Sequence, residues 1–344
     1  MKMRYQLLGS SGLRVSELCL GTMTFGEAWG WGAAKAESKR QFELFAEAGG
    51  NFTDTSVNYT DGESETFLGE FLGSERERFV VATKYSLTKA TSLDPNSGGN
   101  SLKAMRRAVE TSLERLGTDY IDLLYLHMWD YFTPVEEVMS GLNDMVRSGK
   151  VLYIGFSDSP DWIVAEANTL AALRGWAKPV ALQVPYSLAD RAAERALLPM
   201  AQHWGMATLA WGILEAGLLT GKYKRKSSEP TRMQRGEVTI SPRMQAILDA
   251  TDAIAKETGR SMAQVATNWV RQRSQAQVIP IIAARTAKQL ADNLASLEWT
   301  LSPEQLERLD KASHIDLGFP HDFLEGNRNI FGATFDLIDR PARR

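Results

Sequence analysis

The stretch SLKAMRRAVETSLERLGTDYIDLLYLH, residues 101–127, holds one complete helix and the strand that follows it. Its first half repeats apolar residues at helical spacing, with Ser101 placed to cap the helix and Gly117 placed to end it. Its second half, residues 121–126, is a short apolar run typical of a buried strand, and it stops at His127. The stretch therefore predicts one unit of a fold in which strands and helices alternate.

Similar apolar runs recur along the chain, at residues 18–20, 52–53, 79–82, 151–156, 180–184, 207–210 and 278–282. Most runs begin about 28 to 45 residues apart, which is the length of one strand-helix unit. No linker rich in Pro, Gly or Ser divides the chain. Eight such units predict a single α/β domain over residues 1–344, folded as a closed (β/α)8 TIM barrel. An open doubly wound sheet with a second domain is the alternative.

Three segments lie outside this repeat. Residues 1–16 predict an N-terminal β-hairpin that plugs the bottom of the barrel. Residues 222–241 predict an extended polar loop after the seventh strand. Residues 301–344 form a C-terminal extension, whose aromatic part at 319–335 is a candidate to fold over the barrel mouth. Within the repeat, Pro134 is predicted at the first position of a helix.

The composition excludes several classes of protein and of binding site. The chain has 344 residues, and its 39 Lys and Arg against 42 Asp and Glu give a net charge of −3, which offers nucleic acid or anionic lipid no general attraction. Cys19 is the only cysteine, so an intramolecular disulfide and a cysteine metal cluster are excluded, and a reducing, cytoplasmic location is predicted. The most apolar stretch, residues 205–221, carries Glu215 and reads as a buried strand entering a glycine-rich loop, not a membrane span. No export signal is recognised at the N-terminus.

Ionisable residues follow three neighbouring strands of the predicted barrel. Asp54 closes the second strand, Tyr59 lies in the loop after it, Lys84 closes the third and His127 the fourth. Each residue alone has an ordinary interpretation, as a turn or capping residue, a loop aromatic, a solvated strand end or a core histidine. Because the active sites of such barrels lie at the carboxyl ends of the strands, their joint placement favours one catalytic site.

The residue types fit general acid catalysis on a carbonyl group. A free tyrosine has a pKa of about 10, and a nearby Lys84 ammonium would favour the phenolate and so lower that value. Asp54 would keep Lys84 charged and oriented, and His127 could hydrogen-bond the substrate oxygen. No nucleophile motif accompanies them. These residues therefore supply the proton donor and the group that binds the carbonyl oxygen, and the reduction still requires a hydride donor.

With these residues in place, the chain resembles the aldo-keto reductase family along most of its length. The similar segments are LGSSGLRVSELCLGTMTFG, NFTDTSVNYTDGESETFLGEFL, VVATKYS, LGTDYIDLLYLHMWD, YIGFSDS, LQVPYS, GLLTGKY and IPIIAARTAKQLADN. The resemblance is strongest to bacterial members of the branch that includes the potassium-channel β subunits. It implies that Asp54, Tyr59, Lys84 and His127 form the catalytic tetrad, and that NADP(H) binds without a Rossmann domain. NAD(H) is the second choice of cofactor, and no metal is expected.

The resemblance also implies a set of cofactor-binding positions, which are Gly21, Thr22, Asp54, Ser157, Asp158, Gln183, Trp211, Gly217, Leu219, Lys222, Arg285, Gln289 and Asn293. Trp211 stands where relatives stack an aromatic ring on the nicotinamide. Asp158 departs from the usual Asn, because a carboxylate can accept from the carboxamide NH2 but cannot donate to its oxygen. The alternative for Asp158 is a cap of the helix that begins near Pro160.

The expected phosphate contacts come from the last two strand ends. The backbone around Gly217 can approach a pyrophosphate, and Lys222 adds charge there. The basic residues that follow Lys222 read as a solvated loop. Arg285 could pair with a 2′-phosphate, which favours NADP over NAD.

A substrate pocket is expected from aromatic and apolar side chains in loops on the catalytic side, namely Phe25, Trp29, Trp31, Tyr85, Met128, Trp129 and Phe132. The sequence thus predicts an NADPH-dependent reductase of aldehydes or ketones in which Tyr59 is the general acid. The alternative is a regulatory or redox-sensing subunit that binds NADP(H) with little turnover, as the channel-associated relatives suggest. The predicted partner is a small carbonyl compound, with neither nucleic acid nor membrane. The oligomeric state is left open.

Overall fold

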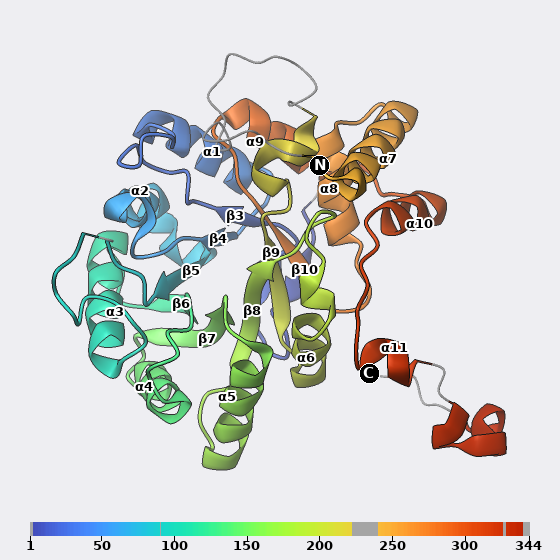
Figure 1. Ribbon diagram of the computed structural model, residues 1–344. Helices are drawn as coiled ribbons and strands as arrows, with labels where there is room; N and C mark the ends of the chain where they lie inside the picture. The colour runs from blue at the N-terminus through green and yellow to red at the C-terminus, as the bar shows by residue number, and fades with distance from the viewer. Residues whose placement is uncertain (1–2, 90, 222–239, 326–327, 340–344) are drawn as a thin grey trace.

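The computed structural model describes residues 3–89, 91–221, 240–325 and 328–339. Its parallel strands close into an eight-stranded barrel, because the last strand pairs with both its predecessor and the first (Figure 1). The strands are β3 (Cys19–Gly21), β4 (Phe52–Asp54), β5 (Val80–Tyr85), β6 (Ile121–Leu126), β7 (Val151–Ser157), β8 (Pro179–Pro185), β9 (Ala207–Trp211) and β10 (Val278–Ile282). The predicted (β/α)8 barrel is confirmed, and the open sheet is wrong.

Helices surround the barrel (Figure 1). They are α1 (Lys35–Glu47), α2 (Glu63–Leu72), α3 (Leu102–Leu116), α4 (Val135–Arg147), α5 (Asp161–Arg174), α6 (Leu197–Trp204), α7 (Pro242–Thr258), α8 (Met262–Arg271) and α9 (Ala287–Leu294). The Ser101 side chain accepts from the backbone NH of Ala104, and Gly117 adopts the left-handed conformation that ends α3, both as predicted. None of the described helices is long and apolar enough to cross a bilayer.

Pro134 differs from its prediction by one position. It precedes α4 as the N-cap, with an extended ψ of 139°, and Val135 is the first helical residue. A proline fixes φ but leaves ψ free, so the ring fits the cap position as well as the first turn. The interior of α4 still follows the predicted apolar stripe, with Met139 and Leu142 fully buried.

The N-terminal hairpin closes the lower end of the barrel. Its strands β1 (Tyr5–Leu7) and β2 (Arg14–Ser16) pair antiparallel, and Leu8 and Val15 pack with the side chains of the barrel interior. Gly9 has a φ of +55°, and a Cβ there would lie 2.5 Å from the carbonyl oxygen of Val180. Only glycine fits this contact, which fixes the hairpin beneath β8.

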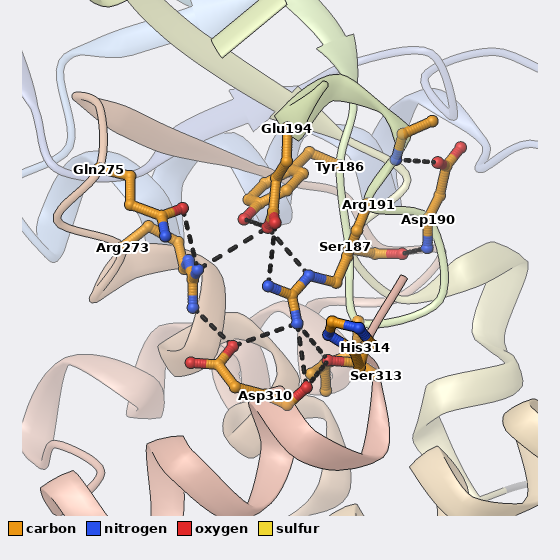
Figure 2. A network of polar contacts seen from close by, with 12 residues as sticks. Tyr186, Ser187, Asp190, Arg191, Glu194, Arg273, Gln275, Asp310, Ser313 and His314 are labelled. Atoms are coloured by element: carbon orange, nitrogen blue, oxygen red, sulfur yellow. Dashed lines mark hydrogen bonds and ion pairs between the residues drawn. The ribbon is translucent and has the colours of Figure 1, made fainter. Parts of the chain in front are cut away.

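The C-terminal extension begins with α10 (Pro303–Ala312), and a network of ion pairs, nearly buried except for Asp310, connects it to the loop after β8. Figure 2 shows the Glu194 carboxylate beside two guanidinium groups, at 2.9 Å from Arg191 Nε and 3.7 Å from Arg273 Nη2. Arg273 Nη1 also lies 2.7 Å from Asp310 Oδ1 on α10. Buried charges need such partners because unpaired ones are costly. The network therefore stabilises the attachment of α10 to the barrel.

Beyond α10, the extension contains α11 (His321–Leu324) and the 3₁₀ segments η7 (Arg328–Ile330) and η8 (Gly332–Leu337). In Figure 1 this red segment projects from the side of the barrel. Several large apolar side chains on it are exposed, namely Phe319, Phe323, Leu324, Ile330, Phe331, Leu337 and Ile338. The expectation that residues 319–335 fold over the mouth is not met by the part of the tail that the structure describes.

Candidate active site

The four tetrad positions come together at the carboxyl ends of three neighbouring strands. Asp54 is the last residue of β4, and Lys84 is the next to last of β5, one position earlier than predicted. His127 follows β6 directly, and Tyr59 begins the 3₁₀ segment η1 (Tyr59–Gly62). The register pairs β4 with β5 and β5 with β6, so the strand-end side chains share the barrel interior.

Lys84 stands at the centre of this group and is fully buried. Its Nζ donates to Asp54 Oδ2 at 2.6 Å, to the carbonyl oxygen of Thr55 at 2.8 Å and to Tyr59 Oη at 3.2 Å. Gln183 Nε2 donates to the second carboxylate oxygen of Asp54 at 2.8 Å. Both Asp54 oxygens are therefore engaged, which fixes the direction of the ammonium toward the Tyr59 hydroxyl.

The protonation states follow from burial and from these contacts. Burial alone would lower the pKa of Lys84, but Asp54 and Tyr59 together raise it above its ordinary value. Burial raises the pKa of Tyr59 above 10, and the Lys84 ammonium offsets this only in part. The prediction of a lowered Tyr59 pKa is therefore wrong, because desolvation of the phenolate outweighs the attraction of one ammonium. At neutral pH Tyr59 carries its proton and Lys84 carries its charge.

His127 is uncharged at neutral pH. Burial, and then the Lys84 ammonium, hold the pKa of its imidazole well below the ordinary value of 6.5. Its ring lies edge to face with Tyr59, with the two centroids 5.7 Å apart. The Nδ1 atom lies 3.1 Å from Ser56 Oγ. A neutral imidazole has one NH, so only one of its nitrogens can donate to a substrate.

The loop that carries Tyr59 is held in an unusual conformation. Thr60 and Asp61 have φ values of 44° and 57°, a region that residues other than glycine rarely adopt. Arg115 on α3 supports this loop, because its Nη1 donates to the carbonyl oxygen of Val57 at 2.6 Å and lies 3.3 Å from the buried Glu65 carboxylate. We did not predict Arg115 or Glu65, although a glutamate on the inner face of α2 was a visible signal.

The opposite side of the mouth suits a nicotinamide carboxamide. Ser157 ends β7 and pairs in register with Gln183 on β8. Its Oγ is buried and has no hydrogen-bond partner among the described residues. Buried hydroxyls are normally satisfied, so an unpaired one beside an amide side chain fits a ligand that brings its own donor and acceptor.

Asp158 adopts a left-handed conformation with a φ of 37°, and its Oδ1 accepts from Trp211 Nε1 at 3.1 Å. The capping alternative is wrong, because the N-cap of α5 is Pro160. Trp211 ends β9, and 39% of it is exposed. The Asp158 carboxylate thus orients an indole ring that is accessible for stacking.

The residues predicted for the phosphate end occupy two loops. Gly217 has a φ of 94° within η4 (Glu215–Thr220), where Leu219 is fully buried. Arg285 and Gln289 lie at the start of α9, and Gln289 Oε1 accepts from the backbone NH of Arg285 at 3.0 Å. Lys222 lies outside the described residues.

At three of the predicted cofactor-binding positions, Thr22, Asn293 and Gly21, the structure shows contacts within the protein fold. Thr22 is fully buried and hydrogen-bonds the backbone carbonyl of Asp54. Asn293 is buried and donates to the carbonyl oxygen of Ala283 at 3.3 Å. Gly21 packs against β10, where a Cβ would lie 2.7 Å from the Ile281 side chain. The Thr22 and Asn293 side chains thus support the turns of the site, and Gly21 allows the close packing of β3 on β10.

The substrate side is lined by fewer aromatic residues than expected. Trp29 lies edge to face with Tyr59, with centroids 6.2 Å apart, and Trp31 lies 5.8 Å from Trp29. Phe25 lies in the loop after β3 as predicted, whereas Tyr85 is the last residue of β5. Both side chains are fully buried in the layer between barrel and helices, so neither lines an open pocket. Tyr85 is in β5, where the alternation of side chains points it away from Lys84.

The remaining predicted pocket residues belong to the loop after β6. Trp129 is nearly buried and packs in the same outer layer as Phe25 and Tyr85. Met128 is half-exposed, and 92% of Phe132 is exposed. Within the described ranges, no group of three or more His, Cys, Asp or Glu side chains is arranged to hold a metal ion. Of the predicted pocket residues, Trp29 thus contacts the Tyr59 ring, and Trp31 contacts Trp29.

Comparisons with known proteins agree with this geometry. Aryl-alcohol dehydrogenase of Pestalotiopsis microspora is 38% identical over 93% of this chain and 85% of its own length. Norsolorinic acid reductase B of Dothistroma septosporum is 38% identical over 94% and 85%. Aryl-alcohol dehydrogenase [NADP(+)] of Phanerodontia chrysosporium is 37% identical over 98% and 91%. The profile of the aldo/keto reductase family matches residues 17–314, and the chain therefore belongs to this family of carbonyl-reducing enzymes.

Proposed function

We propose that this enzyme reduces aromatic aldehydes or ketones with NADPH, and that Tyr59 donates the proton to the substrate oxygen. The observation that carries the proposal is the contact of 3.2 Å between Lys84 Nζ and Tyr59 Oη, at a mouth where Tyr59 is protonated at neutral pH. The bound nicotinamide would supply a hydride to the carbonyl carbon. Trp29 beside Tyr59, with Trp31 packed on Trp29, favours an aromatic substrate, and so does the similarity to fungal aryl-alcohol dehydrogenases.

The protein residues have separate tasks in this proposal. His127 hydrogen-bonds the carbonyl oxygen and directs it toward the Tyr59 hydroxyl. As negative charge develops on that oxygen, Tyr59 transfers its proton, and Lys84 stabilises the phenolate that remains. Asp54 keeps Lys84 charged and in place. Ser157 and Gln183 would bind the carboxamide, and Asp158 would hold Trp211 for stacking on the ring.

Oxidation of NADPH followed at 340 nm tests the proposal, with substituted benzaldehydes, aryl ketones, short aliphatic aldehydes and aldose sugars as substrates. We expect kcat/KM to be highest for the aromatic compounds, because the indole rings add apolar contact area. Equal rates for aliphatic aldehydes would remove the aromatic preference. Negligible turnover across the whole panel, together with tight retention of NADP(H) and a stable protein partner, would favour the regulatory alternative.

The choice of NADPH over NADH rests on Arg285. Its guanidinium belongs to the loop at the N-terminus of α9, where the helix dipole also favours an anion. A 2′-phosphate placed there would form charge-assisted hydrogen bonds with Arg285. The Phanerodontia chrysosporium relative is named an NADP(+)-dependent aryl-alcohol dehydrogenase, which supports the same choice.

Arg285→Ala is therefore expected to raise the KM for NADPH about 10- to 100-fold, since charge-assisted contacts contribute about 1.5–3 kcal/mol. The KM for NADH should change by less than about threefold, because NADH lacks the phosphate that Arg285 would pair with. Arg308→Ala removes an exposed arginine of α10 and serves as the control. An equal loss for both cofactors in Arg285→Ala would contradict the 2′-phosphate role.

Several finer predictions stay predictions. The relatives compared above are fungal, and a bacterial origin and a place in the potassium-channel β branch remain predictions from the sequence. The cytoplasmic location, the single-domain organisation over 1–344 and the absence of nucleic-acid and membrane partners are likewise predictions. We propose them as the working description of this enzyme.

A further inference from the structure

A second polar group contacts the Nδ1 side of His127. Ser56 is fully buried in the loop between Asp54 and Tyr59. Its Oγ lies 3.1 Å from His127 Nδ1, 2.7 Å from Asn58 Oδ1 and 3.4 Å from the carbonyl oxygen of Lys84. A serine hydroxyl has a single proton, so only one of these three atoms can receive it.

The receiver of that proton determines what His127 can do. If Ser56 donates to Asn58 Oδ1, then Nδ1 can be hydrogen-bonded to Ser56 only by carrying the imidazole proton and donating it to Oγ. The Nε2 atom is then a bare acceptor and cannot hydrogen-bond a carbonyl oxygen. If Ser56 donates to Nδ1, the proton of the neutral ring sits on Nε2, which can then donate to a substrate.

The Asn58 side chain is compatible with either direction of the Ser56 hydrogen bond. Its side-chain amide has an acceptor end and a donor end, and a half-turn of the group exchanges them. Among the described residues, Ser56 is its only side-chain hydrogen-bond partner. With the NH2 end toward Ser56, Asn58 donates to Oγ and leaves the Ser56 proton for Nδ1.

We propose that Ser56 is a positioning residue that holds His127 in its Nε2–H tautomer, in a hydrogen-bond chain that runs from Asn58 through Ser56 to His127. This assignment rests on the proposed function, in which His127 directs the substrate oxygen. Ser56 touches neither substrate nor cofactor and acts through the imidazole. No bond is broken in the chain, because each group only donates a hydrogen bond to the next.

The tautomer can be observed without turnover. Protein labelled with 15N at histidine has four imidazoles, and the resonances of His127 are identified by their loss in His127→Gln. Long-range 1H–15N correlation at pH 7.5 should show a pyridine-like Nδ1 and a pyrrole-like Nε2 in the wild-type chain. A pyrrole-like Nδ1 in the wild-type chain would overturn the proposal.

Two variants test the role of the serine hydroxyl. Ser56→Ala should mix the two tautomers and lower kcat for benzaldehyde about tenfold, the loss expected for one neutral hydrogen bond, with KM for NADPH unchanged. Ser56→Thr keeps the hydroxyl and should restore both the tautomer and kcat to within about threefold. A Ser56→Ala protein with wild-type tautomer and kcat would contradict the proposal. A serine-dependent Nε2–H tautomer in a protein without carbonyl turnover would instead contradict the proposed function alone.

Discussion

Tyr59→Phe is expected to lower kcat for aldehyde reduction about 10²- to 10⁴-fold, the contribution typical of a positioned general acid. The phenylalanine ring keeps the edge-to-face contacts with Trp29 and His127, so the substrate side should retain its shape. Only the hydroxyl that lies 3.2 Å from Lys84 Nζ is lost. Single-turnover oxidation of NADPH, started by mixing with benzaldehyde, measures the chemical step directly.

Tyr59→Phe should slow the reduction step without weakening the binding of NADPH. The proposed contacts with NADPH come from the loops after β7 to β10, so its Kd, measured by quenching of Trp fluorescence, should change by less than about threefold. Tyr5→Phe is the matched control, because the Tyr5 hydroxyl also makes one hydrogen bond, to the carbonyl oxygen of Gly49, but on the N-terminal hairpin. Turnover above a tenth of wild type in Tyr59→Phe would rule out its role as the general acid.

The barrel and the convergence of the four candidate residues at its mouth could be predicted because each depends on the order of segments along the chain. Parallel strands place their carboxyl ends together, so residues that end successive apolar runs must converge wherever the chain folds as a barrel. The convergence of Asp54, Lys84 and His127 could be predicted from this argument alone. The hairpin followed from the same reasoning, since a strand pair before the first barrel strand can pack only at the end where that strand begins.

The contacts behind the tetrad could not be predicted in this way. Arg115 reaches the Tyr59 loop from α3, and Ser56 reaches His127 from the loop after β4, so both contacts depend on distances between side chains distant in sequence. The direction of the Tyr59 pKa also depends on burial, which the positions of charges along the chain do not define. Tyr85 was misplaced because one more residue in β5 turns its side chain to the outer face.

Asp54→Asn tests the ion pair that orders the site. The amide keeps the size of the carboxylate but leaves the fully buried Lys84 ammonium without a counter-charge. Breaking one half of a buried pair costs about 3–5 kcal/mol, so the free energy of unfolding at pH 7 should fall by about that amount. Urea unfolding measures it through a lower midpoint with an unchanged m value. Glu136→Gln breaks an exposed ion pair with Arg174 and should change the free energy of unfolding by less than about 0.5–1 kcal/mol.

The pH dependence of Asp54→Asn distinguishes this cause from a packing defect. In the wild-type chain the pKa of Lys84 is above its ordinary value, so its contribution to stability is present at neutral pH and is lost as the pH rises through the folded-state pKa. Without Asp54, burial dominates and brings that pKa below the unfolded value. The unfolded chain then binds more protons, so stability should rise from pH 6 to pH 9, where the wild-type contribution of Lys84 is flat.

A second substitution completes the test. Asp54→Asn with Lys84→Met removes the unpaired ammonium and replaces it with an apolar side chain of similar length. The double variant should regain most of the stability lost in Asp54→Asn and lose its dependence on pH between 6 and 9, because no buried charge remains to titrate. Its catalytic activity should stay low, since Tyr59 no longer has a cation to stabilise its phenolate. A double variant as unstable as Asp54→Asn would contradict the assignment of the lost stability to the unpaired Lys84 ammonium, since the amide oxygen introduced by Asp54→Asn can still accept from Gln183.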